Sequence, residues 1–182
     1  EGAAMGTGTR TDYELIHGVY NLMPNEVLGK IMYNNMKAVG GFTYTEEEKQ
    51  FAEKIATTLN RPDISLSSTA MVQPFEVIEE GNGGSTDVGD ISWVVPTAGA
   101  GTATWVPGTA AHSWQAVAAG GTSIGAKGMM VAAKTMALTV VDLFNDPGAR
   151  AAAKAELERR RGANFSYQPL LGDRKPPLDY RK

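Results

Sequence analysis

The side chains best suited to chemistry in this sequence lie in two loops. In the first loop, Asp87 and Asp90 stand three residues apart beside the hydroxyl groups of Ser85 and Thr86. Two carboxylates at this spacing can bind a metal ion or orient a histidine. An Asx or serine turn that starts a strand uses the same residue types, so this alternative stays open. The loop lacks the regular acidic spacing of a calcium site.

The second loop carries His112, one of only two histidines in a chain of 182 residues without cysteine. It follows a predicted strand at residues 102–106, and ligands bind beside the carboxyl ends of strands in α/β sheets. A lone loop histidine is also commonly a plain surface residue. Because a histidine-based metal site needs more ligands than this, metal chemistry would require other residues or another polypeptide.

A glycine-rich segment at residues 120–127 superficially resembles a phosphate-binding loop. The match fails because Ala126 separates Gly125 from Lys127, and because Gly128 stands where a metal-binding hydroxyl is needed. We interpret the segment as the start of a helix whose small residues allow close packing. The free N–H groups of a helix N-terminus can hold an anion, so a carboxylate-binding role stays open.

The elements that must position these loops follow from apolar spacing and capping residues. Four helices are predicted, at residues 26–40, 45–59, 123–144 and 147–161. Asn25 and Asp146 are the expected N-caps of the first and last, and Thr45 with Glu48 forms a capping box for the second. The helix at 123–144 is apolar nearly all round, which is typical of a helix buried in a large core.

Three strands are predicted, one at residues 9–20 before the first helix and two short ones at residues 91–95 and 102–106 between the second and third helices. His17 lies on a face of the first strand and receives no site assignment. Strands separated by helices favour an α/β fold. Residues 62–90 are expected to be mostly irregular, and residues 163–182 to form an extended tail.

The composition is that of a globular protein, with 42% hydrophobic residues, 20% charged residues and a net charge of −3. Proteins that bind nucleic-acid phosphates are usually basic, so no nucleic-acid partner is expected. No uninterrupted apolar run reaches the ~18 residues of a membrane span, and the first residues do not resemble a signal peptide. We therefore expect no membrane partner and a cytoplasmic location, which the lack of cysteine also fits.

Several segments, taken in order, resemble the di-metal aminoacylase/carboxypeptidase amidohydrolase family. They are Tyr20–Asn25, Gly84–Thr97, Pro107–Gln115 and Ile124–Met129. The resemblance covers nearly the whole chain, and the run from Ser85 to Asp90 is its most specific part.

The resemblance implies a larger enzyme with an α/β catalytic domain of the zinc-peptidase type and a small α+β lid domain that mediates dimerisation. The early metal-ligand motifs of that family and its glutamate base are missing from this sequence, so we expect a C-terminal segment. Residues 1–22 would be the end of the lid domain, including its last strand. Residues 23–162 would be the C-terminal part of the catalytic domain, and residues 163–182 the tail.

The resemblance also implies roles for the two loops. His112 matches the last metal-ligand histidine of the family, while Ser85, Thr86, Asp87 and Asp90 would touch the substrate or support the metal ligands. No catalytic residue is assigned to this chain, which alone is expected to be inactive. The complete enzyme would hold two divalent metal ions, zinc or manganese.

The implied reaction is hydrolysis of an amide between an aryl or acyl group and an amino acid, with p-aminobenzoyl-glutamate as the leading candidate substrate. The implied partners are the missing N-terminal half of the catalytic domain, a second copy through the lid domain, and the small-molecule amide. A non-catalytic assembly or binding module is the alternative, because the sequence has two histidines and no complete ligand set.

Overall fold

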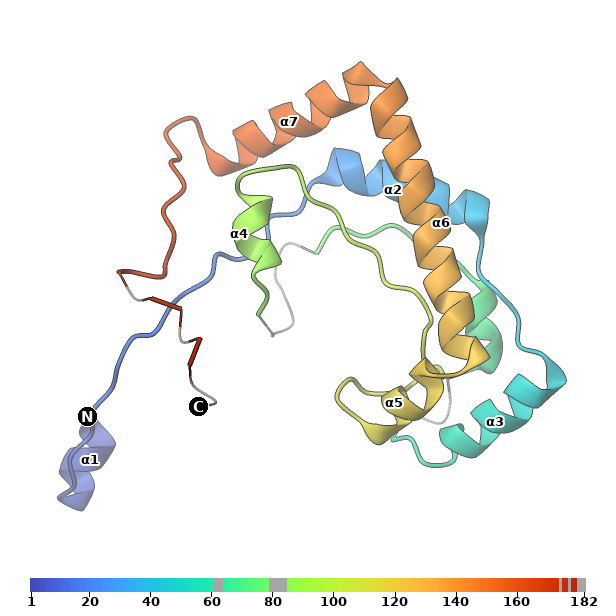
Figure 1. Ribbon diagram of the computed structural model, residues 1–182, viewed down its shortest axis with the longest axis horizontal. Coiled ribbons are helices and arrows are strands. Elements are labelled where there is room, and N and C mark those ends of the chain that lie inside the picture. The colour runs from blue at the N-terminus through green and yellow to red at the C-terminus, as the bar shows by residue number, and fades with distance from the viewer. Residues whose placement is uncertain (61–63, 79–84, 174, 177, 180–182) are drawn as a thin grey trace.

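The structure, a computed structural model, describes residues 1–60, 64–78, 85–173, 175–176 and 178–179. Within these residues it consists of helices joined by irregular segments (Figure 1). In chain order the helices are α1 (Gly2–Thr7), α2 (Glu26–Val39), α3 (Glu46–Ala56), the 3-10 helix η1 (Leu66–Ala70), α4 (Val88–Ser92), α5 (Trp114–Gly120), α6 (Ser123–Asn145) and α7 (Pro147–Arg161).

The prediction of an α/β fold is wrong, and so is the prediction of a lid strand at the N-terminus, because the described residues contain no β-strand. Residues 9–20 and 102–106 are irregular, and helix α4 takes the first part of the strand predicted at 91–95. A strand needs a neighbour for its backbone N–H and C=O groups. These segments make only isolated bonds instead, such as the one from the Gly18 N–H to the Leu170 carbonyl.

The four predicted helices are confirmed, and their capping residues act as expected. The Asn25 side chain accepts a hydrogen bond from the Leu28 N–H at 3.0 Å. Thr45 and Glu48 form both bonds of the capping box of α3. Asp146 caps α7, whose bounds are those predicted, while α3 ends at residue 56 and therefore earlier than predicted. Helices α1, α4 and α5 were not predicted, because they are short and lack a periodic apolar face.

The hydrophobic core is small and lies where α3, α5 and the start of α6 meet. Its buried residues are Tyr44, Ala52, Ile55, Val106, Ala119 and Ile124. Close packing here depends on glycine: a Cβ atom on Gly128 would overlap the carbonyl oxygen of Ala103, and one on Gly125 would overlap that of Gly120. The interpretation of this segment as a closely packed helix start is therefore confirmed.

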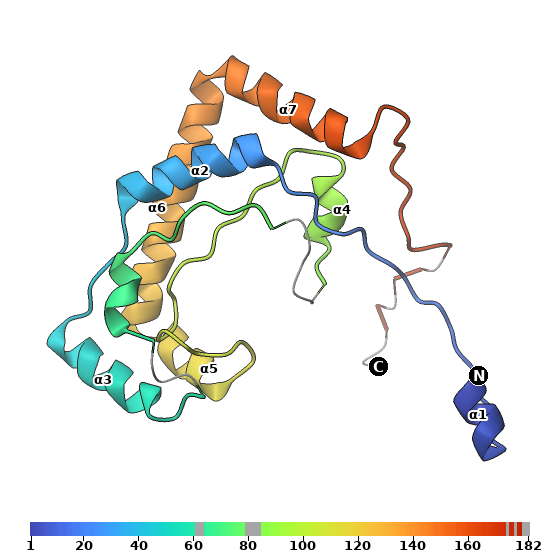
Figure 2. The ribbon, with the colours of Figure 1, turned by 180° about the vertical axis from the view of Figure 1, so that it is seen from behind.

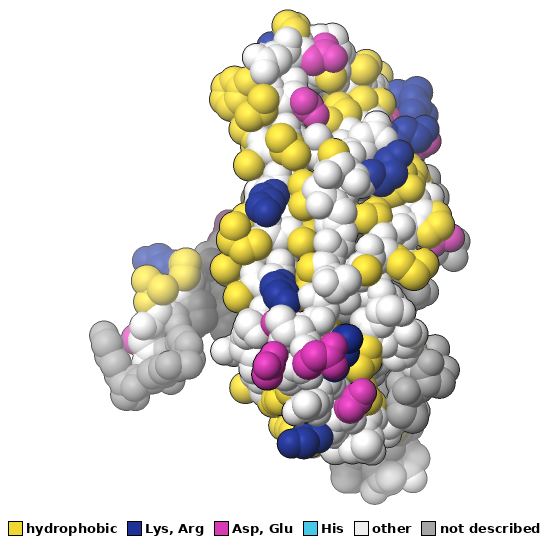
Figure 3. All heavy atoms as spheres, turned by 90° about the vertical axis from the view of Figure 1, so that its right-hand side faces the viewer, with side chains coloured by type: hydrophobic (Ala, Val, Ile, Leu, Met, Phe, Trp, Pro, Cys, Tyr) yellow, Lys and Arg dark blue, Asp and Glu magenta, His cyan; other side chains and the backbone are white. Residues whose placement is uncertain are grey.

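Helix α6 packs along α2, yet it buries small and polar side chains and exposes larger apolar ones. Its buried residues are Ile124, Gly125, Gly128, Thr135 and Thr139. Its exposed apolar residues include Met129, Met136, Val140, Val141 and Phe144. Apolar side chains are accordingly spread over the face of the molecule that Figure 3 shows, while acidic side chains gather over its lower part. The expectation that this helix lies inside a large core is wrong for the described chain.

Helix α6 is also long and apolar enough to cross a membrane, judged by length and composition alone. Only 28% of its most apolar 18-residue window is buried. One such helix is weak evidence for a membrane protein, because core helices of soluble proteins pass the same test.

Most of the helices form an open arc. Helices α2, α6 and α7 lie along one part of it, and α3 and α5 lie together at the other end (Figures 1 and 2). Helix α1 and the C-terminal tail extend away from the arc. Helix α4 and irregular segments lie on the inner side of the arc.

Candidate functional site

The polar run predicted from the sequence is described from Ser85 onward and leads into helix α4. Ser85, Thr86 and Asp87 are exposed. The Thr86 hydroxyl accepts a hydrogen bond from the Val88 N–H at 3.3 Å, which closes a local turn. The turn alternative of the sequence analysis is thus present here, although it starts a helix and not a strand. The glycines that precede Ser85 lie outside the described residues.

Asp90 lies at a junction of three segments. Its Oδ2 accepts a hydrogen bond from the Tyr20 N–H at 3.2 Å, and its Oδ1 accepts one from the Tyr167 hydroxyl at 2.9 Å. The hydrogen bond to Asp90 raises the pKa of Tyr167 above its ordinary value. Close by, the Ser92 hydroxyl accepts a bond from the Met23 N–H at 2.8 Å. Asp90 therefore holds α4 to the chain before α2 and to the C-terminal tail.

Aromatic rings reinforce this junction. The ring centroids of Tyr20 and Trp93 are 5.4 Å apart, and those of Trp93 and Phe165 are 4.9 Å apart. The indole N–H of Trp93 donates to the Asn21 carbonyl at 2.8 Å, and the Arg161 guanidinium lies 5.9 Å from the Phe165 ring. The polar run thus leads into a cluster of hydrogen bonds and ring contacts that joins segments distant in the sequence.

His112 is exposed and stands directly before helix α5. Its backbone has φ 58°, in the left-handed region that residues other than glycine adopt at a cost. Its imidazole ring makes no hydrogen bond to the part of the chain that the structure describes. The next residue, Ser113, caps α5 by accepting a bond from the Ala116 N–H. The turn therefore presents an unengaged imidazole at the surface.

The two predicted loops are not brought together by any contact among the described residues. Helices α4 and α5, which follow the polar run and His112 respectively, lie apart in both ribbon views (Figures 1 and 2). No group of three His, Asp or Glu side chains that could hold a metal ion occurs in the described ranges. His112 offers one nitrogen donor, so these residues do not by themselves form the two-metal site that the resemblance implies.

A buried carboxylate, Glu48, is the centre of a further polar network. Its Oε2 lies 2.5 Å from the Lys127 Nζ and accepts a bond from the Thr45 N–H at 2.7 Å, while its Oε1 accepts one from the Ser123 hydroxyl at 2.6 Å. Burial alone would raise the pKa of Glu48, but the donors from Lys127, Ser123 and Thr45 outweigh it and lower the pKa to about 2. Burial, assisted by this charge, raises the pKa of Tyr44 to about 12.

Glu48 also bears on whether the glycine-rich segment at residues 120–127 binds a carboxylate. The Ser123 hydroxyl and Lys127 both belong to the first turns of α6, and both bind the Glu48 carboxylate. A carboxylate of the chain itself therefore lies at this helix start, held by two side chains and not by the free N–H groups that the sequence analysis considered. The capping-box pattern identified Glu48 as a local cap, but no sequence signal pointed to partners more than seventy residues away.

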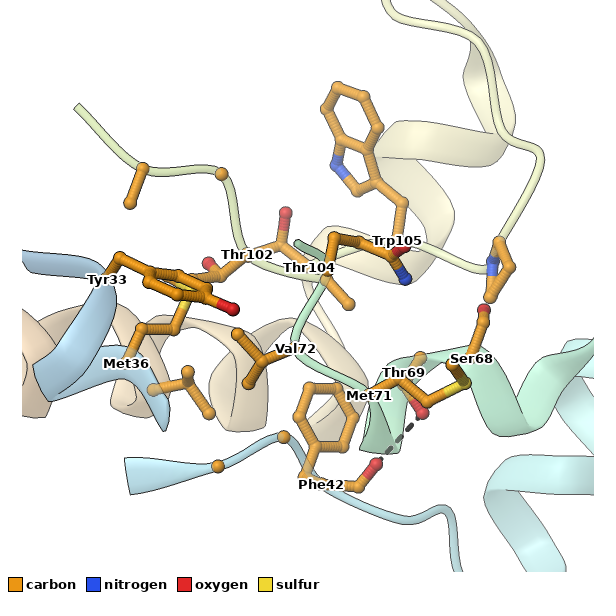
Figure 4. Close-up of a pocket in the computed structure, with 18 of the residues that line it drawn as sticks. Tyr33, Met36, Phe42, Ser68, Thr69, Met71, Val72, Thr102, Thr104 and Trp105 are labelled. Atoms are coloured by element: carbon orange, nitrogen blue, oxygen red, sulfur yellow. Dashed lines mark hydrogen bonds between the residues drawn. The ribbon is translucent and has the colours of Figure 1, made fainter. Parts of the chain in front are cut away.

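A pocket of about 700 Å³ opens between α2, η1 and the segment that leads to α5. Tyr33 and Met36 lie at one end of this pocket and Ser68 and Met71 at the other, with Val72 between them (Figure 4). Among the described residues that line the pocket, Glu76 alone is charged. No sequence pattern indicated this pocket, because its walls come from segments far apart in the chain, two of which have no regular structure.

Comparison with known proteins identifies a relative. The chain is 35% identical, over 171 residues, to a subunit of p-aminobenzoyl-glutamate hydrolase from Escherichia coli (strain K12). The alignment covers 81% of this chain and 36% of the relative, so the chain spans about a third of that protein's length. No family model matches the chain. No solved structure matches it either. The chain is thus a relative of this hydrolase polypeptide, in agreement with the resemblance carried by its motifs.

Proposed function

We propose that this chain is part of a metal-dependent amidohydrolase that cleaves an amide between an aryl or acyl group and an amino acid, with p-aminobenzoyl-glutamate as the leading candidate. The observation that carries the proposal is the 35% identity, over 81% of the chain, to an E. coli protein named for that hydrolysis. Because the chain spans about a third of that relative, further polypeptide has to complete the enzyme. The relative is named as one subunit of its hydrolase, which supports a partner chain as well.

In this proposal His112 supplies one nitrogen ligand to a pair of zinc or manganese ions, and the added polypeptide supplies the others. Neutral imidazole suits both metals. The exposed position of His112 and its lack of hydrogen bonds within the described chain support the assignment, since the ring is available to a group from outside. Ser85, Thr86 and Asp87 are exposed and can still face such a partner, whereas Asp90 is engaged in the structural junction.

The test is reconstitution. The chain is co-expressed with the portion of the E. coli relative that lies outside the alignment, and the release of glutamate from p-aminobenzoyl-glutamate is measured with added zinc or manganese. We expect turnover by the co-purified pair and none by either part alone. Metal-dependent turnover by the chain alone would refute the conclusion that this chain has too few metal ligands to form the site by itself. A stable, metal-loaded pair without amidase activity would refute the proposed function.

A non-catalytic assembly module is the second candidate. It is favoured by the lack of any three-residue metal cluster in the described ranges and by the structural use of Asp90. In that case the pair would still form, but its metal content and amidase activity would not depend on His112. Elemental analysis of the wild-type pair and of a pair carrying His112→Ala separates the two candidates.

A further inference from the structure

The pocket has two walls without regular secondary structure, whose backbone groups are almost all unpaired. Residues 72–76 form one wall and residues 99–103 form part of the other. Apart from Pro74, which has no N–H, none of these residues donates a backbone hydrogen bond to any part of the chain that the structure describes. On the second wall, a single carbonyl, that of Thr102, accepts one from the Thr104 N–H at 2.9 Å.

Unpaired backbone groups beside apolar side chains have to find partners when water is excluded, because leaving them unbonded costs free energy. A small apolar ligand would fill the pocket without satisfying a row of N–H and C=O groups. An extended peptide does satisfy them, since it adds its own backbone to an exposed edge. The arrangement of this pocket therefore favours a peptide segment over a small molecule.

The two walls differ in their ability to pair. Pro74 interrupts the row of donors at residues 72–76, and proline is avoided where a strand must pair. The other wall, Gly99–Ala100–Gly101, carries no large side chain, and its three N–H groups are available. The edge at residues 99–103 is thus the better one for accepting another backbone.

The lining specifies the chemistry of the occupant. Its side chains are mainly apolar or hydroxyl-bearing: Met32, Tyr33, Met36, Phe42, Val72, Phe75, Thr102, Thr104 and Val131. The rings of Tyr33 and Phe75 lie 5.7 Å apart and form one side of the pocket. Glu76 is the one charged lining residue among those described, so an anionic segment would find no counter-ion and a cationic one would find a single carboxylate at most. The remaining lining favours an uncharged, apolar occupant.

The total surface indicates a stable partner. The chain exposes 13026 Å², whereas a compact monomer of this mass exposes about 8,500 Å². The extended ends contribute to this excess. A permanent interface buries roughly 1,000–2,500 Å² of each partner, so the excess leaves room for an interface of that size.

We propose that the groove between residues 72–76 and 99–103 receives an extended, uncharged, apolar segment of the polypeptide that completes the enzyme, and that this segment hydrogen-bonds to the edge at 99–103. The identity of the partner rests on the proposed function. The shape, the free backbone edge and the mainly uncharged lining rest on the structure of this chain.

Amide hydrogen exchange tests the proposal on the chain alone and on the pair co-expressed with the remaining portion of the E. coli relative. We expect the amides of residues 99–103 to exchange freely in the chain alone and to be slowed at least ~10-fold in the pair, because pairing protects backbone N–H groups. We also expect Ala100→Pro, which removes one of these N–H groups, to weaken association by about tenfold or more. Thr11→Pro is the matched control, because Thr11 lies in another extended, exposed segment outside the groove.

A second variant, Val72→Asp, places a charge in the groove and is expected to weaken association without removing an N–H group. If the pair forms but residues 99–103 remain unprotected and both groove variants bind like wild type, the proposal fails and the proposed function stands. If the folded chain forms no pair at all, both fail. Weaker binding by both groove variants, with Thr11→Pro unaffected, supports the proposal.

Discussion

The Nζ atom of Lys127 lies 2.5 Å from the Oε2 atom of Glu48, and this ion pair joins the capping box of α3 to the first turns of α6. Lys127 also donates to the Thr43 carbonyl at 3.0 Å, just before α3. The Glu48 side chain is buried and that of Lys127 is one-third exposed. The pair therefore fixes two helices on either side of the small core.

The first prediction concerns this pair. We expect Lys127→Met to lower the free energy of unfolding by ~1–3 kcal/mol, because it leaves a buried carboxylate without its charged donor. Lys49→Met is the control, since Lys49 pairs with Glu46 on the surface, where an ion pair contributes ~0–1 kcal/mol. Urea unfolding of the three proteins measures the difference. Equal losses in the two variants would contradict the role assigned to Lys127.

The second prediction is the pH dependence that Glu48 confers. Its pKa is about 2 in the folded chain and 4.5 ordinarily, so the unfolded chain takes up a proton first as the pH falls. The stability contributed by the Glu48 carboxylate is therefore complete above about pH 4.5 and is lost as the pH falls toward about 2. Denaturant midpoints measured across this window should fall less steeply for Glu48→Gln than for wild type. Parallel curves would show that other groups govern acid unfolding.

The sequence allowed the helices to be predicted because their signals are local. Asn25, Thr45 and Asp146 each cap a helix within three or four residues of themselves, and a short stretch of sequence contains all that such a cap needs. The strands predicted at 91–95 and 102–106 are absent from the structure. β-branched and aromatic residues favour an extended backbone, but a strand also needs a neighbour, which local sequence does not specify.

The same limit applies to the candidate site. The polar type and spacing of Asp87 and Asp90 made both residues candidates for a site. The Asp90 carboxylate is instead bonded to Tyr20 and Tyr167, which lie 70 and 77 residues away along the chain. The pocket has no motif at all, because α2 and two irregular segments form it jointly. His112 as a metal ligand stays a prediction.

The third prediction tests close packing at the start of α6. We expect Gly128→Ala to destabilise the chain by ~1–3 kcal/mol, because the added methyl group would overlap the Ala103 carbonyl and the Thr104 side chain. Gly121→Ala is the control, as a Cβ atom there meets no atom within 4 Å. Thermal unfolding followed by circular dichroism compares the two. A Gly128→Ala variant as stable as the control would place α6 farther from residues 103–104 than the structure does.

The fourth prediction concerns the exposed apolar face of α6. Burying one Val or Phe side chain contributes ~1.5–3 kcal/mol, so several exposed ones favour association. We expect the chain alone to bind ANS and to self-associate in light scattering, and the double variant Val140→Lys/Phe144→Lys to do so less. Ala151→Lys, on the exposed surface of α7, is the matched control for added charge. A monomeric wild-type chain without ANS binding would show that this face needs no cover.

The last prediction places His112 in the assembled enzyme. Mutating a residue that supports a metal ligand typically lowers activity or metal affinity ~10–100-fold. If the His112 imidazole itself ligates metal, His112→Ala should lower them by at least that factor. Asp87→Asn should be milder, because an exposed carboxylate that only orients a neighbour or the substrate leaves the metal in place. His112→Gly separates the ring from the backbone: glycine adopts φ 58° without strain, so the folded chain should unfold within ~1 kcal/mol of wild type while metal is lost. Elemental analysis, turnover and urea unfolding of the co-expressed pair supply the three readouts. Full metal content and near-normal turnover in His112→Ala and His112→Gly would make His112 an ordinary surface residue in a strained turn.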